Sequence, residues 1–84
     1  MKRRFFRKKF VYKSGKIKII SEIKLSDAQV DKIFKTTDDL NKYGHYYCYY
    51  VARITYHEVG HLVKKVEAYY KWGKFYIKIT KKTD

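Results

Sequence analysis

The first third of the chain shows a clear alternation of hydrophobic and polar positions. In residues 16–25 (KIKIISEIKL), isoleucine or leucine occupies most odd positions, and lysine or glutamate most even ones. A period of two is typical of a half-buried strand. Residues 4–13 precede the turn dipeptide Ser14-Gly15. The pattern therefore predicts a β-hairpin made of residues 4–13 and 16–25.

A helical pattern begins after this hairpin, at Ser26. The Ser26 hydroxyl can cap the first free N–H groups of a helix, and Gln29, three residues later, completes a capping box. Apolar side chains then recur with a spacing near 3.6 residues. They are Val30, Ile33, Phe34, Thr37 and Leu40. The sequence predicts a helix over residues 27–43 that ends before Gly44.

Residues 45–56 (HYYCYYVARITY) are rich in aromatic and β-branched side chains. Read with a period of two, they predict a strand. In that register the small side chains Cys48 and Ala52 face the helix, and Tyr47, Tyr49 and Arg53 point outward.

The C-terminal run 74–81 (KFYIKITK) also alternates and predicts a strand with Phe75, Ile77 and Ile79 inward. Lys74, Tyr76 and Lys78 then point outward.

The segment 57–72 fits a period of two and a period of 3.6 equally well. We favour strands here, because Gly60 suits a turn after residue 56 and Gly73 suits a second hairpin turn. The predicted fold is α+β: a single antiparallel sheet of about five strands (ββαβββ) with one helix packed on one face. The alternative, ββαβαβ, makes 57–72 a helix.

Length and composition indicate one folded domain over residues 1–84, in which residues 1–9 form a basic arm or an edge strand. With 45% hydrophobic residues the chain is too apolar for a disordered basic tail. The single cysteine, Cys48, excludes an internal disulfide and a cysteine-based zinc site, and we expect it to be a small buried thiol. No segment has the pattern of a signal peptide or a membrane span, so we expect a cytoplasmic protein.

The charge of the chain is its most informative feature for function. The chain has 21 Lys and Arg but only 8 Asp and Glu, a formal net charge of +13. The acids concentrate in the predicted helix, whereas the predicted strands and the N-terminal arm carry the bases. In the predicted fold the helix covers one sheet face, so the positive charge gathers on the other face. A polyanion is the expected partner.

Tyrosines share these outward strand positions with the bases. Lysine and arginine neutralise phosphates, and flat phenol rings can stack on unpaired bases. Tyr69, beside Lys65 and Lys71, is a further candidate for this surface. The predicted contact residues are Arg3, Arg4, Arg7, Lys8, Lys9, Lys16, Lys18, Tyr47, Tyr49, Arg53, Lys74, Tyr76 and Lys78.

Residues 57–61 (HEVGH) have the spacing H-E-x-x-H and resemble the zinc-binding helix of the zincin metalloproteases. The resemblance implies that His57 and His61 hold zinc while the glutamate activates a bound water, which requires a helix. One zincin subgroup adds a glycine and a third ligand, where this chain has Lys64 and Glu67. We interpret the match as fortuitous, with His57 and His61 on the surface, and expect no catalytic residue, metal or cofactor.

We therefore expect a small non-enzymatic protein that binds nucleic acid, with single-stranded DNA or RNA slightly preferred over duplex. The alternative is an interaction protein, such as an inhibitor, that docks an acidic protein partner on the same face. A homodimer through the exposed sheet face is compatible with both interpretations. A minimal zinc hydrolase built on residues 57–61 is a lesser alternative.

Overall fold

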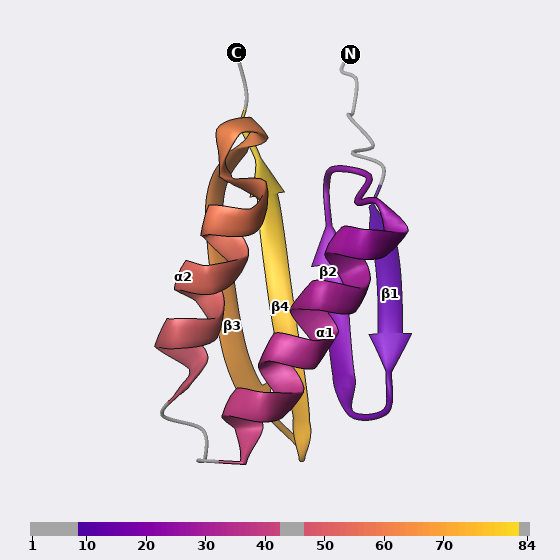
Figure 1. The fold of residues 1–84 in the computed structure, drawn as a ribbon, viewed down its shortest axis with the longest axis vertical. Helices are drawn as coiled ribbons and strands as arrows, with labels where there is room; N and C mark the ends of the chain where they lie inside the picture. The colour runs from indigo at the N-terminus through magenta and orange to yellow at the C-terminus, as the bar shows by residue number, and fades with distance from the viewer. Residues whose placement is uncertain (1–8, 43–46, 83–84) are drawn as a thin grey trace, which may run out of the picture.

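The computed structural model describes residues 9–42 and 47–82 as four strands and two α-helices of an α+β fold (Figure 1). The chain order is β1 (Phe10–Ser14), β2 (Ile17–Ser21), α1 (Asp27–Asn41), α2 (Cys48–Val59), a 3₁₀ turn η2 (Gly60–Leu62), β3 (Val63–Lys71) and β4 (Lys74–Lys81). The strands form one sheet in the order β1-β2-β4-β3. Both helices lie on the same face of this sheet.

The predicted N-terminal hairpin is confirmed, but its second strand ends at Ser21 instead of residue 25, and residues 4–8 of its first strand lie outside the described residues. β1 and β2 pair antiparallel, with Ser14 opposite Ile17, so Gly15 and Lys16 make a two-residue turn. Gly15 has a φ of +59°, which suits the first residue of such a turn and which glycine adopts without steric cost.

The first helix is also confirmed, including its start. The Ser26 hydroxyl accepts a hydrogen bond from the Gln29 N–H at 3.1 Å, and the Gln29 side chain accepts one from the Ser26 N–H at 3.0 Å. Val30, Ile33 and Thr37 are buried along the predicted stripe. The helix is described to Asn41, and the predicted end at Gly44 lies outside the described residues.

The prediction of a strand over residues 45–56 is wrong, because this segment forms most of α2. Val51, Thr55 and Val59 recur every four residues and are buried, as one stripe of a helix requires. The predicted strand would have exposed Val51 and Thr55 and buried Tyr50, which is exposed. The aromatic and β-branched composition favoured a strand, but burial of the helical stripe decides the local structure.

The sheet has four strands rather than five and is mixed rather than antiparallel. Two helices, instead of one, connect β2 to the C-terminal hairpin, and β4 then lies parallel to β2. The strand interpretation of the ambiguous segment holds only for β3, since α2 continues to Val59 and Gly60 belongs to the 3₁₀ turn. The alternative order ββαβαβ is likewise wrong. The predicted hairpin turn at Gly73 is confirmed.

The core lies between the helices and the sheet. Ile19, Ile77 and Ile79 point from the two central strands toward the helices and are almost completely buried. The inward register predicted for residues 74–81 is thereby confirmed. Ile33 of α1 and Val51 of α2 belong to the same buried cluster. The opposite face of the sheet is not covered by any helix or strand among the described residues.

Candidate functional site

The sheet face turned away from both helices, called the open face here, carries a row of side chains that crosses all four strands. Lys13 of β1 lies opposite Lys18 of β2, Lys18 lies beside Tyr76 of β4, and Tyr76 lies opposite Tyr69 of β3. Register partners point to the same face of a sheet, so the row places two lysines next to two tyrosines. We call it the Lys–Tyr row.

The two tyrosines of this row stack on each other. The ring centroids of Tyr69 and Tyr76 are 5.2 Å apart, and the ring planes differ by only 15°. Tyr69 lies on the edge strand and is 40% exposed, whereas Tyr76 is half-buried. The pair therefore forms a fixed aromatic surface with its accessible part toward the edge of the sheet.

Lysines surround the row on the same face. Those placed on the open face by the strand register are Lys13, Lys18, Lys65, Lys71, Lys74 and Lys78. Among the described strand residues of this face, the only acid is Glu67. Glu67 pairs with Lys65 at 3.8 Å in an exposed contact, which is screened by solvent and is weak. The open face is strongly positive as a result.

Most acids of the described residues lie on the helix layer. Four aspartates belong to α1, and this helix carries only two lysines within its bounds. Glu58 of α2 also faces α1, where its carboxylate forms an ion pair with the Lys32 ammonium at 3.1 Å. The predicted separation of charge between helix and strands is thus present in the folded chain.

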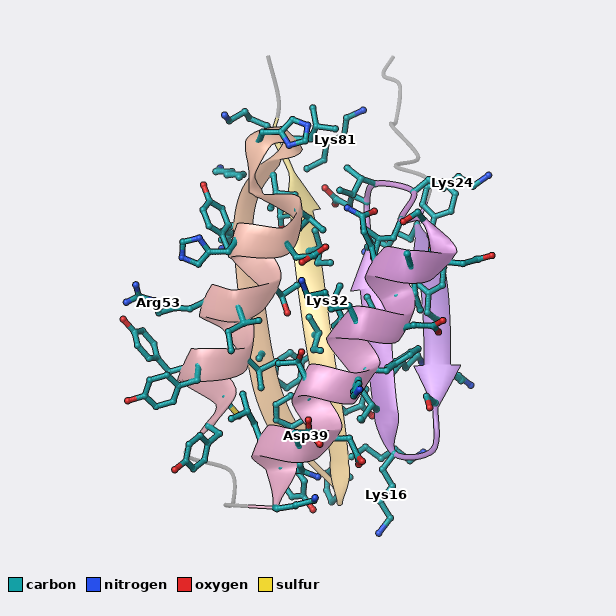
Figure 2. All side chains as sticks on the ribbon, viewed as in Figure 1. Lys16, Lys24, Lys32, Asp39, Arg53 and Lys81 are labelled. Atoms are coloured by element: carbon teal, nitrogen blue, oxygen red, sulfur yellow. The ribbon has the colours of Figure 1, made fainter. Side chains whose placement is uncertain are left out.

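Predicted contact residues Lys16, Lys18 and Lys74 meet at the end of the sheet where both hairpins turn. With Lys13, Gly15, Ile17 and Tyr76 they line a hollow of about 140 Å³, called the lysine hollow here. The hollow forms because β2 and β4 are parallel and begin side by side, with the Phe75 N–H donating to the Lys16 carbonyl at 2.8 Å. Figure 2 shows the Lys16 side chain projecting outward from the molecule at this end.

Three other predicted contact residues lie on the opposite layer, because residues 48–59 are helical. Tyr47 precedes α2, and Tyr49 and Arg53 are exposed one helical turn apart. The Arg53 guanidinium donates to the Tyr49 hydroxyl at 3.1 Å and lies 5.7 Å from the centre of its ring. Figure 2 shows Arg53 projecting from α2 at the side of the molecule. These residues do not join the Lys–Tyr row.

Tyr49 and Arg53 instead line a groove of about 550 Å³ between α2 and the edge strand β3, called the edge groove here. Its other lining residues are Ala52, Tyr56, His57, Lys64, Lys65 and Val66. A register shift between Val63 and Lys65 places Lys64 at this edge. The groove combines cations with aromatic rings, so it is a second surface suited to an anionic partner.

The remaining predicted contacts come from the N-terminal arm. Arg3, Arg4, Arg7 and Lys8 lie outside the described residues. Lys9 is described and exposed, directly before β1.

The H-E-x-x-H segment is split between two elements. His57 lies in the last turn of α2, His61 lies in the 3₁₀ turn, and both are exposed. Glu58 is held by Lys32 of the neighbouring helix. In the part of the chain that the structure describes, no group of three or more His, Cys, Asp or Glu side chains is placed to hold a metal ion.

Cys48 opens α2 and is half-buried beside the core. Burial raises the pKa of the Cys48 thiol, because desolvation disfavours the thiolate. An activated cysteine nucleophile has a lowered pKa and an accessible thiolate, whereas the Cys48 thiol has a raised pKa and is half-buried.

None of the described helices is long and apolar enough to cross a lipid bilayer.

Two functional candidates were missed by the sequence interpretation. Lys13 joins the row because it directly precedes the first hairpin turn, and its register follows from that turn. Trp72 occupies the tip of the second hairpin between Lys71 and Gly73, and the available signal in the sequence was a bulky aromatic residue directly before the predicted turn glycine.

Comparisons of the chain with family models, with curated proteins and with solved structures found no match.

Proposed function

We propose that this protein binds nucleic acid through the open face, without acting as an enzyme. The observation that carries the proposal is the Lys–Tyr row, in which phosphate-binding cations lie beside a stacked tyrosine pair. Lysines on a sheet surface neutralise successive phosphates and release counterions, and exposed rings stack on unpaired bases. Single-stranded DNA or RNA fits this combination better than duplex, whose bases are already stacked.

The direct test is a salt titration of binding to a labelled single-stranded oligonucleotide. If the open face contacts roughly 4–7 phosphates of the single strand, the log–log slope of affinity against salt is about −3 to −5. Replacing Lys18 and Lys78 together by glutamine should weaken binding and flatten the slope by about 1.4, because two contacts are lost. Measurement by fluorescence anisotropy gives both affinity and slope.

The matched control replaces Lys35 and Lys42 by glutamine. These lysines are exposed at the helix layer, and the change in net charge is the same. Their replacement should change affinity much less than the open-face pair does. Equal effects of the two double variants would mean that only net charge matters, and this would contradict a site on the open face.

The alternative function, docking of an acidic protein partner, is favoured by the edge groove. Tyr49 is 62% exposed there and lies beside Arg53, and the groove has no acid among its described lining residues. Tyrosine and arginine are enriched where proteins bind each other. Binding of an acidic protein that does not require nucleic acid, and that is lost on Arg53→Ala, would support this alternative.

A further inference from the structure

Trp72 is the most exposed large hydrophobic side chain of the described chain, at 83%. It is the only tryptophan in the sequence. The ring lies at the tip of the β3–β4 hairpin, directly between Lys71 and Gly73. At this exposure it contributes almost nothing to the core, so packing within the chain does not explain its presence.

The backbone at Trp72 is also strained. Its φ is +56°, and it is the only residue other than glycine with a positive φ in the described chain. Trp72 and Gly73 form a two-residue turn in which both φ values are positive, as a type I′ turn requires. Asparagine or glycine makes this turn readily, whereas a bulky side chain makes it at a cost. Strain kept at an exposed position is typical of functional sites.

The two hairpin turns lie at the same end of the sheet (Figure 1), and the lysine hollow, lined by Gly15, Lys16 and Lys74, is therefore at the end that carries Trp72. Lys74 links the two features, because it follows Gly73 and also lines the hollow. Lys13, Lys16 and Lys18 bring further positive charge, and the described lining residues include no acid. An anion held in the hollow would therefore lie next to the hairpin that carries the exposed ring.

We propose that the lysine hollow binds a backbone phosphate of a single strand while Trp72 stacks on an unpaired base beside it. This inference rests on the proposed function and adds a second binding site to it, in which a phosphate is held by the lysine hollow and an unpaired base by Trp72. Tyr76 belongs to both the hollow and the Lys–Tyr row, so the bound nucleic-acid strand continues from this end onto the open face. Duplex offers the phosphate but not the free base.

The test uses the fluorescence of Trp72, which reports this one position. A short thymidine oligonucleotide and a duplex of the same length are titrated into the full chain, and anisotropy of the labelled nucleic acid is measured in parallel. We expect the single strand to quench Trp72 emission at saturation and the duplex to leave it nearly unchanged. Anisotropy reports binding anywhere on the protein, so the two readouts separate this site from the rest of the surface.

Trp72→Asn should stabilise the fold and at the same time weaken binding of the single strand. The melting temperature should rise by roughly 4–8 °C, because asparagine suits the turn. Affinity for the single strand should fall by roughly 5- to 150-fold, the loss of one base–aromatic stack. Trp72→Tyr keeps a ring and should retain most of the affinity. Leu62→Asn, which removes another exposed apolar side chain at the far end of β3, is the control and should not weaken binding.

The phosphate part of the site is tested by Lys16→Gln, with Lys24→Gln at the opposite end as its control (Figure 2). Only Lys16→Gln should flatten the salt slope, by about 0.7 for one contact with a single strand.

Four results would overturn the inference. Binding without quenching, with unchanged affinity of Trp72→Asn, would remove Trp72 from the site while leaving the proposed function standing. Quenching by duplex equal to that by single strand would remove the preference for unpaired bases. No binding of either nucleic acid would overturn both proposals. A blue shift of Trp72 emission with anionic phosphatidylserine vesicles, without a response to oligonucleotide, would assign the hairpin tip to a lipid surface.

Discussion

Ser26 illustrates how a single side chain defines the start of an element. Its hydroxyl and the Gln29 side chain satisfy two N–H groups that α1 cannot pair internally. We expect Ser26→Ala to lower the free energy of unfolding by about 0.5–2 kcal/mol in urea denaturation. Ser14→Ala, at an exposed strand end, is the control and should stay within about 0.5 kcal/mol of the unchanged protein. Equal losses would argue against the capping box.

The positions of the proposed contact residues were only partly predictable. Lys74, Tyr76 and Lys78 are on the open face as expected. The residues that alternate with them, Phe75, Ile77 and Ile79, are large apolar side chains that are buried in the core. Tyr47 and Tyr49 were expected beside them and lie on the helix layer instead. In a strand, one wrong register moves a whole set of side chains, and a wrong element type has the same effect.

At the scale of elements, α1 and α2 differ in how much local information they carry. The first helix has a capping box, an acidic first turn and a clean apolar stripe. The second has no side-chain cap at Tyr47, and its tyrosine, valine, isoleucine and threonine side chains favour strands when taken singly. Only burial of Val51, Thr55 and Val59 against β3 and the core selects the helix, and that information is tertiary.

The burial of residues along α2 allows a stability measurement to distinguish a helix from a strand in this segment. Val51 is 1% exposed and Ile54 is 40% exposed, whereas a strand over 45–56 would bury Ile54 and expose Val51. We expect Val51→Ala to cost about 1.5–3 kcal/mol, since buried methyl groups are lost. Ile54→Ala should cost less than about 1 kcal/mol, because alanine favours the helix and little burial is lost. Urea denaturation of the two variants gives the comparison, and the reverse order would contradict the helix.

The sheet order also depends on tertiary contacts. Each hairpin is marked by its turn glycine, and both are found where the sequence indicates them. Which hairpin strands meet is not encoded locally. β4 rather than β3 lies beside β2, so the two strands that bury isoleucines at every second position form the centre of the sheet, and β3, with its charged side chains, lies at the edge. Charged edge strands resist pairing with other sheets.

At the scale of the whole molecule, the two layers differ in charge but both present rings beside cations. The open face has the Lys–Tyr row and six lysines against Glu67. The edge groove has Tyr49 with Arg53, and Lys65 contributes to both surfaces. Under the proposed function, a single nucleic-acid strand on the open face would reach the groove only around the edge of β3. Paired tyrosine variants test which of the two surfaces contacts the bases.

We expect Tyr69→Ala to weaken binding of a single-stranded oligonucleotide by roughly 5- to 150-fold at every salt concentration, because a stacking ring is lost. The salt slope should not change, since no phosphate contact is removed. Tyr49→Ala is the matched control: it removes the same ring from an exposed position of the helix layer. Under the proposed function it should leave affinity nearly unchanged. If Tyr49→Ala weakens binding and Tyr69→Ala does not, the bases lie in the edge groove. If Tyr69→Ala leaves affinity intact but converts a dimer to a monomer in sedimentation, the stacked tyrosines belong to a self-association surface.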